Sequence, residues 1–399
     1  MTDKLVPKLR FKDDNGNNYP AWQTKPLGNI SDFLDGKRIP IKESERAKMT
    51  GKYPYYGASG IIDYVNDFIF DQDIILLGED GENIISRNLP LAFKVTGKCW
   101  VNNHAHVISP NHGVHIDYLT QYLEQLNYKK YNTGTAQPEL NQEICKNIYI
   151  KLPILIEQTK IADFLTSVDD KIQQLTKKKV LLEQYKKGIM QQIFSQQLRF
   201  KDDSGKDYPA WQERTLGDIA IQLVNGVSLE QNDYSNGYKV TRIETISDTY
   251  ININRVGFID TSVNIEGYKL KIGDMLFSNI NSVKHIGKIA YVDKDYNLYH
   301  GMNLLKIRIN DKNNSKYMYY VLTSIKYKSH FEKICNQAVN QASINQSELK
   351  KTTMHLPYLE EQTKIADFLT SIDDKITQVT AMLKQIQQYK KSLLQQMFI

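Results

Sequence analysis

The 399-residue sequence is long enough for two or three domains, each able to bury a hydrophobic core. Hydrophobic residues make up 41% and charged residues 24%, which is ordinary for a globular protein and excludes a collagen, a disordered tail protein and a disulfide-stapled mini-protein. The net charge of +6 permits a nucleic-acid partner without requiring one.

The first recognisable element is a short segment that occurs twice. The strings Leu-Arg-Phe-Lys-Asp-Asp and Tyr-Pro-Ala-Trp both occur in residues 9–22 and again, in the same order, in residues 198–211. We name these two copies block A. Because internal repeats define the organisation of a chain, each copy of block A is expected to open one half of the sequence.

Residues 23–152, between block A and the next repeated block, have a mixed α/β pattern. Short β-rich runs at residues 68–70, 74–77 and 92–95 alternate with Asp-Gly and Thr-Gly turn signals. A helical stretch follows at residues 116–126. The region has the size of one domain.

A longer repeated block, which we name block B, begins at residue 157. Residues 157–194 recur as residues 361–398, and the first eleven residues of the two copies are identical. Neither copy contains a proline, and eight of ten a/d positions in the first copy and nine of ten in the second are apolar, which is typical of a coiled-coil helix. The two ladders are Ile161, Leu165, Val168, Ile172, Leu175, Lys179, Leu182, Lys186, Ile189, Ile193, and Ile365, Leu369, Ile372, Ile376, Val379, Leu383, Ile386, Lys390, Leu393, Met397.

The equal length and register of the two copies favour pairing within one chain. A coiled coil between two chains is the alternative. The carboxylates of Asp169, Asp170, Asp373 and Asp374 are interpreted as a solvated helix face or a docking surface rather than as catalytic acids.

Residues 212–356 fill the second half in the way that residues 23–152 fill the first. They have β-rich runs at residues 250–253, 275–277 and 304–307 and a helical stretch at residues 316–333. The two variable regions barely align, so they are expected to have analogous functions on different targets. The predicted division is 1–22, 23–152, 153–197, 198–211, 212–356 and 357–399. The fold class is α+β, with two mixed α/β domains separated by two long antiparallel coiled-coil helices in a pseudo-twofold internal repeat.

The variable regions are rich in side chains that suit DNA. Lysine and arginine neutralise phosphates, and Asn, Gln and Arg can make bidentate contacts with base edges. A coding bias toward A·T-rich codons is an equally good explanation of the abundant Asn, Lys and Tyr. The candidate DNA-binding residues are Lys37, Arg38, Tyr55, Tyr56, Asn102, Asn103, His104, Lys129, Lys130, Gln137, Arg242, Asn279, Asn281, Lys284, His285, Asn340 and Gln341.

Motifs of catalysis and metal binding are missing from the sequence. It has no phosphate-binding glycine loop, no HExxH and no GxSxG, and the histidines of residues 104–106 and 112–115 read as surface or turn residues rather than a metal site. The three cysteines form no CxxC pair, which favours a reducing compartment. With no secretory signal visible and no apolar run that could span a bilayer, we expect a cytoplasmic protein without a membrane partner.

The repeated blocks resemble the specificity subunit of type I restriction-modification enzymes. The resemblance rests on Leu152-Pro153 followed by residues 157–165, and on their copies, Leu356-Pro357 and residues 361–369. Residues 134–141 are similar to the family's domain exit, although the counterpart at residues 338–345 lacks the Gly-Thr pair, and residues 53–60 resemble a segment of its target domains.

The resemblance, which covers essentially the whole chain, implies a non-catalytic subunit. Each variable region would be a target recognition domain that reads half of a split site in double-stranded DNA. The helices would set the spacer and dock two methyltransferase subunits, and restriction/translocase subunits would join the complex. Cofactors would be bound by those partners (S-adenosylmethionine, ATP and Mg²⁺) and none by this chain. The alternatives are a structural coiled-coil adaptor and a self-contained DNA methyltransferase or nuclease.

Overall fold

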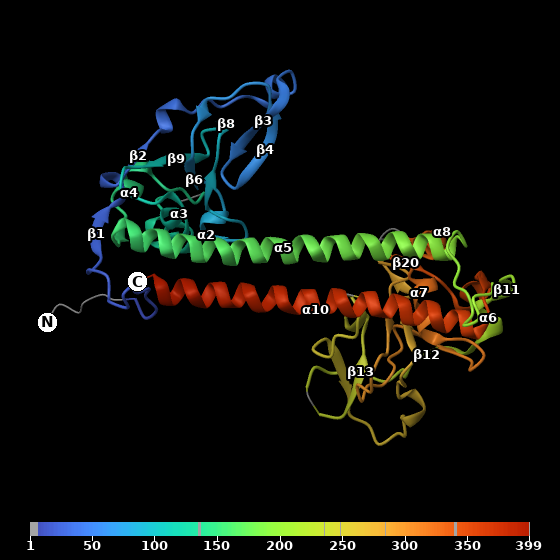
Figure 1. The fold of residues 1–399 in the computed structure, drawn as a ribbon. Helices are drawn as coiled ribbons and strands as arrows, with labels where there is room; N and C mark the ends of the chain where they lie inside the picture. The colour runs from blue at the N-terminus through green and yellow to red at the C-terminus, as the bar shows by residue number, and fades with distance from the viewer. Residues whose placement is uncertain are drawn as a thin grey trace. The chain divides into compact units, whose positions relative to one another are not determined.

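The computed structural model describes residues 7–134, 137–234, 236–247, 249–283, 285–338 and 341–398. The chain forms two compact units: unit 1 comprises Met1–Lys177 with Thr380–Ile399, and unit 2 comprises Lys178–Val379. The long helices α5 (Leu155–Phe194) and α10 (Leu359–Met397) both cross this division, so each unit contains a stretch of each helix (Figure 1). In the described part of the chain, no helix combines the length and the apolar character needed to cross a membrane.

Unit 1 holds two four-stranded sheets and one strand pair. Strand β6 is central in the first sheet and all of its residues are buried. Its side chains alternate between two hydrophobic cores, with Ile75 and Leu77 on the side of α3 (Ile116–Gln125), and Ile74 and Leu76 on the other side. The strand orders are β2 (Ser31–Phe33), β9 (Ala105–Pro110), β6 (Ile74–Gly78), β7 (Ala92–Val95); β4 (Gly60–Val65), β3 (Thr50–Gly57), β8 (Lys98–Val101), β5 (Phe70–Asp71); and β1 (Gln23–Pro26) with β10 (Tyr149–Leu152).

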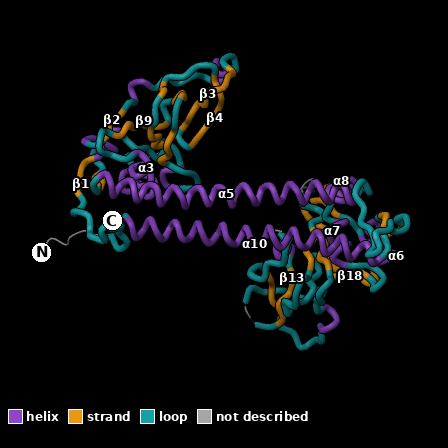
Figure 2. Tube along the Cα trace, viewed as in Figure 1, coloured by secondary structure: helices purple, strands orange, loops and turns teal. Residues whose placement is uncertain are grey.

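Unit 2 repeats part of this plan. Strand pair β11–β21 brings the start of the second variable region to its end, as β1–β10 does in the first. Helices α7 (Ser315–Leu322) and α8 (Ile325–Ile334), which belong to the purple helices of Figure 2, supply buried side chains to the largest core of the unit. The strand orders are β11 (Gln212–Thr215) with β21 (Thr353–Leu356); β12 (Ala220–Asn225), β18 (Leu305–Ile309), β15 (Met275–Phe277), β17 (Ile289–Tyr291); β13 (Tyr238–Thr241) with β14 (Val256–Ile259); and β16 (Ile280–Asn281), β20 (Gln341–Ser343), β19 (Asn336–Ala338).

Short helices connect these strands and carry several of the polar side chains of each unit. In unit 1 they are η1 (Leu27–Asn29), η2 (Asp35–Lys37), α1 (Glu43–Arg46), α2 (Asn83–Ser86), α3 (Ile116–Gln125), η3 (Tyr128–Tyr131) and α4 (Gln142–Lys146). In unit 2 they are α6 (Leu216–Ile219), η4 (Ile243–Ile246), η5 (Glu266–Tyr268) and α9 (Gln346–Lys350).

Most predicted elements within the variable regions are confirmed, although of the run at residues 68–70 only Phe70 lies in a strand, β5. The strand predicted at residues 250–253 is wrong: Ile251 is buried, but the Asn252 side chain accepts a hydrogen bond from the Asn254 backbone and closes a turn instead. The helix predicted at residues 316–333 is broken at Thr323, whose hydroxyl bonds the Tyr319 carbonyl at 2.7 Å, and the following Ser324 opens α8.

The long helices pair antiparallel within each unit. In unit 1, Ile161 and Leu165 of α5 share a core with Leu393 and Met397 of α10. In unit 2, Ile193 of α5 packs with the core formed by Ile365, Leu369 and Ile372 of α10. The predicted apolar seam and its pairing within one chain are therefore confirmed.

Two lysines interrupt the apolar ladders, and each is paired with an aspartate of the facing helix. Lys390 Nζ lies 2.6 Å from Asp169 Oδ1 in unit 1, and Lys186 Nζ lies 2.6 Å from Asp373 Oδ1 in unit 2. Asp169 and Asp373 are partly exposed and are held in these ion pairs, whereas their neighbours Asp170 and Asp374 are exposed, as expected of a solvated helix face. A polar residue in a coiled-coil seam favours the one register in which it finds its partner.

A buried carboxylate at the start of each block B holds the copy of block A in the same unit. Glu157 is fully buried, and it accepts hydrogen bonds from Arg10 at 2.7 and 2.8 Å and from Trp22 Nε1 at 3.2 Å. Glu361 repeats the arrangement in unit 2 with partners Arg199 and Trp211. Hydrogen bonding to Glu157 raises the pKa of Arg10, as Glu361 raises that of Arg199, so both pairs are ionic.

The glutamine after each glutamate holds the first long helix of the variable region. Gln158 Oε1 accepts a hydrogen bond from the His115 backbone, just before α3, and Gln158 Nε2 donates to the Pro153 carbonyl at 2.8 Å. Gln362 makes the corresponding bonds to the Asn314 backbone, just before α7, and to the Pro357 carbonyl. We name each Glu-Gln pair with these contacts a joint.

The end of α10 gives unit 1 the same contacts that the end of α5 gives unit 2. The Phe398 ring lies 5.6 Å from that of Tyr118, and the Phe194 ring lies 6.0 Å from that of Tyr317. The Leu9 amide bonds the Gln396 carbonyl, and the Leu198 amide bonds the Gln192 carbonyl. Residues 178–197 therefore make in unit 2 the same ring contact and backbone hydrogen bond that residues 380–399 make in unit 1.

A half-length chain of residues 1–197 is predicted to form a dimer. Its seam, including Ile161 and Leu165, is left uncovered, and the end of the same helix in a second copy offers Ile189, Ile193 and Phe194 to cover it. Light scattering should give twice the mass of the half-chain. Leu165→Asp is the matched control and should not dimerise; a monomeric half-chain with the native Leu165 would contradict the prediction.

Loss of a joint carboxylate is predicted to destabilise its own unit. Glu157→Ala leaves the Arg10 guanidinium and the Trp22 N–H without their acceptor, and removing one partner of a buried ion pair costs roughly 3 kcal/mol or more. Urea titration should show this loss for Glu157→Ala and for Glu361→Ala. Glu183→Ala, on an exposed part of α5, should change the free energy of unfolding by less than about 0.5 kcal/mol; equal effects of all three variants would refute the role of the joints.

Candidate nucleic-acid interface

Several of the predicted contact residues of unit 1 gather where β8 ends and β9 begins. Asn102 is buried: its backbone N–H donates to the Tyr56 carbonyl, and its side chain accepts a hydrogen bond from the His104 backbone at 2.9 Å, so it shapes the turn that carries exposed Asn103 and His104. The Nδ1 atom of exposed His104 lies 2.7 Å from Asp80, and Arg38 Nη1 donates to the Asn103 carbonyl. The structure thus brings together residues from three separate stretches of the sequence.

The Arg38 side chain lies in a network of charged groups below this surface. It pairs with Glu79 and donates to the Ala105 carbonyl at 2.8 Å, and it lies 3.6 Å from Asp35. Asp35 also accepts hydrogen bonds from His106 Nδ1 at 2.6 Å and from Gln142 Nε2 at 2.7 Å. Arg38 is therefore tied to the domain's own polar core rather than directed freely to solvent.

His106 is fully buried, so its interpretation as a surface or turn histidine is wrong. Burial by itself would lower the pKa of His106, but hydrogen bonds with the Asp35 and Cys145 side chains raise it to about 10. The same hydrogen bond with His106, opposing the effect of burial, lowers the pKa of Asp35. Residue 106 is therefore an imidazolium at neutral pH.

The ligand atoms of Asp35, Glu79 and His106 lie within 4.8 Å of one another, close enough for a metal site. The donor chemistry does not fit one, because His106 Nδ1 faces the Asp35 carboxylate and His106 Nε2 lies 2.8 Å from the Leu140 carbonyl. Both nitrogens then carry protons and neither has a lone pair to offer. The cluster is an ion-pair network that connects residues 140–142, near the end of the variable region, to β9.

Other predicted contact residues of unit 1 lie outside this gathering. Tyr55 is buried and its hydroxyl accepts a hydrogen bond from the Ile41 backbone, so it belongs to the core. Lys37 lies exposed on η2, beside Arg38, while Lys129 and Lys130 are exposed on η3. Exposed Gln137 precedes Pro138, whose carbonyl accepts a hydrogen bond from Gly81.

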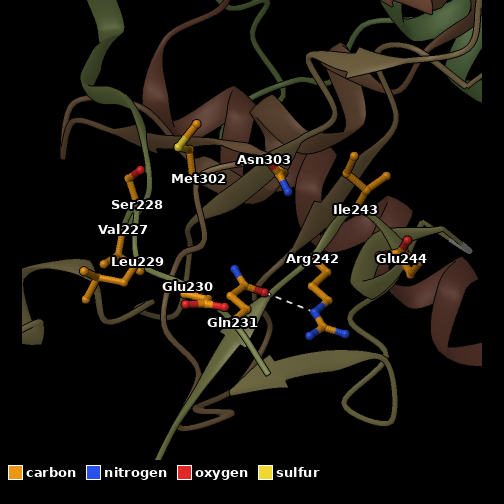
Figure 3. A pocket seen from close by; sticks show the side chains of 10 residues that line it. All are labelled: Val227, Ser228, Leu229, Glu230, Gln231, Arg242, Ile243, Glu244, Met302 and Asn303. Carbon is orange, nitrogen blue, oxygen red and sulfur yellow. Dashed lines mark hydrogen bonds between the residues drawn. The ribbon is translucent and has the colours of Figure 1, made fainter. Parts of the chain in front are cut away.

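In unit 2 the predicted residue Arg242 lines a hollow of 520 Å³ (Figure 3). Its guanidinium donates to Gln231 Oε1 at 3.1 Å, to Asp233 Oδ1 at 2.6 Å and to the Asn232 carbonyl at 3.0 Å. Its side chain nevertheless keeps 30% exposure. The site therefore presents a fixed but accessible arginine.

Four further predicted residues of unit 2 lie on or next to strands β16 and β20. Asn281 pairs with Ala342, the residue after exposed Gln341, while Asn279 is buried and its carbonyl accepts a hydrogen bond from Ile344. His285 follows in the turn, where its amide bonds the Ser282 carbonyl. Lys284 and Asn340, which were also predicted, lie outside the described residues.

Sequence reasoning missed the residues that position these groups. Asp35, Glu79 and His106 hold Arg38, while Gln231 and Asp233 hold Arg242. No sequence spacing connects Asp35 with His106, because they meet only through the pairing of β2 and β9. The joints did leave a signal, since Glu157-Gln158 and Glu361-Gln362 open the verbatim repeat.

The chain belongs to a family described as the type I restriction modification DNA specificity domain. The family model matches residues 20–184 and again residues 209–388, so the two matches follow the internal repeat. Each match contains one variable region and most of one long helix.

Two relatives have the same kind of name. The putative type I restriction enzyme MjaX specificity subunit of Methanocaldococcus jannaschii is 40% identical over 214 residues, which are 53% of this chain and half of that protein. The putative specificity subunit S.HindORF215P of Haemophilus influenzae is 26% identical over 89% of both chains. Among solved structures, the S subunit of a type I restriction-modification system from M. genitalium has a TM-score of 0.66 over 99% of both chains at 14% identity, which shows a shared fold.

The charge network of unit 1 predicts a pH-dependent stability. The folded-state pKa of His106, about 10, is above its unfolded value of about 6.5. Its contribution is therefore fully present below pH 6.5 and is lost progressively as the pH rises toward 10. The free energy of unfolding, measured at several pH values between 6.5 and 10, should fall less steeply for His106→Gln than for the parent protein. Equal slopes would show that His106 is not charged in the folded state.

Proposed function

We propose that this chain is the DNA sequence-specificity subunit of a type I restriction-modification complex and carries no catalytic site of its own. The observation that supports this best is that the repeated frame is the same in both halves of the chain while the variable regions differ. Two dissimilar variable regions are attached through the same joint to matching helices. A chain of this design suits the reading of two different DNA half-sites by one frame.

In this proposal each variable region recognises one half of a bipartite site in double-stranded DNA. The exposed lysines, such as Lys37, Lys129 and Lys130, contribute affinity through phosphates, and the polar gatherings around Asn102 and Asn281 read base edges. The helices set the spacing of the half-sites and dock two methyltransferase subunits, and restriction/translocase subunits complete the complex. Those partners bind S-adenosylmethionine, ATP and Mg²⁺, and the complex acts in the cytoplasm.

Exchange of one variable region is predicted to change one half-site only. Residues 23–152 would be replaced by the corresponding region of a relative, joined within β1 and β10, which lie side by side. The methylated motif, mapped by long-read sequencing of DNA from cells with the complete methyltransferase, should then change in one half. Exchange of residues 212–356 is the matched experiment for the other half. An unchanged motif, or a change in both halves at once, would contradict the proposal.

A further inference from the structure

Arg242 is an accessible cation whose orientation is fixed by three hydrogen bonds. Three of its five N–H groups bond Gln231, Asn232 and Asp233, through Nε and one hydrogen of each terminal nitrogen. One N–H therefore remains on each terminal nitrogen. Two such hydrogens on a fixed plane are what bidentate recognition of a planar partner uses.

The surrounding backbone is built to admit this arrangement. A Cβ atom on Gly257 would lie 2.5 Å from Arg242 Nε and 2.4 Å from Gln231 Oε1, so no larger residue fits there without displacing the pair. Reciprocal backbone hydrogen bonds between Asn232 and Phe258, at 2.9 and 3.0 Å, fix the acceptor segment against β14. The guanidinium is thus held from both strand and loop.

Arg242 and Glu244 both line two hollows of unit 2. The two residues contribute to the hollow of 520 Å³ and also to a second hollow of 580 Å³. Glu244 is exposed and lies two residues after Arg242, in η4 (Figure 3). An arginine and a carboxylate are therefore both accessible from the same hollows.

The charge of the residues that line these two hollows argues against a phosphate ligand. Arg242 is accompanied by Glu230 and Glu244 in the first hollow, and by Asp233, Glu244 and Arg255 in the second, so neither lining has an excess of positive charge. Phosphate binding depends on such an excess. A base edge is neutral and offers donors and acceptors instead, which a mixed pair of arginine and carboxylate can satisfy.

We propose that Arg242 and Glu244 read one G·C base pair in the major groove, with Arg242 donating to guanine O6 and N7 and Glu244 accepting from the N4 amino group of cytosine. These are the contacts for which the two side chains have matching geometry and polarity. The inference rests on the proposed function. It adds that the half-site read by residues 212–356 contains a G·C pair and names the residues that select it.

The test uses the complete methyltransferase with substitutions in this chain. Arg242→Gln should reduce discrimination at one G·C position of that half-site by about ten-fold to a hundred-fold and leave the other half-site unchanged. Glu244→Gln, on an exposed residue that can be replaced without loss of folding, should relax the same position. Genome-wide mapping of methylated bases gives the discrimination at every position.

Arg242→Gln also separates base reading from phosphate binding. Loss of a phosphate contact weakens binding about equally for all sequences, whereas loss of a guanine contact relaxes the motif at one position. Uniformly weaker methylation by Arg242→Gln with unchanged discrimination at every position would overturn the inference in favour of a phosphate contact. Arg214→Gln, which lies outside both hollows, is the control and should leave the motif unchanged.

Failure of this inference and failure of the proposed function give different results. If exchange of residues 212–356 changes a half-site that contains no G·C pair, or if Glu244→Gln and Arg242→Gln relax nothing, the inference is wrong and the specificity subunit stands. If neither exchange of a variable region changes any half-site, the proposed function itself is wrong.

Discussion

The buried Glu-Gln joint is the constraint on which the rest of this structure depends. A carboxylate with no solvent exposure is unfavourable unless it is paired, and Glu157 is paired with Arg10 and Trp22 of the chain's first repeated segment. The next residue, Gln158, is equally buried. Its side-chain amide accepts a hydrogen bond from the backbone of His115, before α3, and donates one to the carbonyl of Pro153, before α5. Two adjacent side chains thus fix the helix, block A and the variable region against one another.

The seam between the helices adds the second constraint, which is register. An apolar seam alone tolerates a slip by one heptad, because the a and d positions repeat. Lys186 and Lys390 remove that freedom, since each meets its aspartate in one register only. The lysines make the ladders less apolar. In the register that they select, the joints and the helix ends form the contacts described above.

The sequence predicted the frame of this fold far better than its polar sites. Verbatim repetition marked the joints, and heptad spacing marked the seam residues from Ile161 to Met397, because both follow from local periodicity. The network of Asp35, Arg38, Glu79 and His106 could not be predicted, since it is assembled from three separate stretches by the sheet. For the same reason Tyr55 was proposed as a DNA contact although it lies in a core, because tyrosine suits either environment.

The joints also explain how one frame can carry two dissimilar domains. Gln158 and Gln362 grip backbone amides, of His115 in one unit and Asn314 in the other, and both donate to a proline carbonyl. Since a backbone N–H is present in any residue except proline, the side chains of the variable region are free to differ at these contacts. Elsewhere the side chains of each variable region must match the frame, as in the ring contacts of Tyr118 with Phe398 and of Tyr317 with Phe194 and in the apolar cores that the long helices share with both regions. A frame that holds its domains at the joints through main-chain atoms tolerates different side chains at those points of the variable regions.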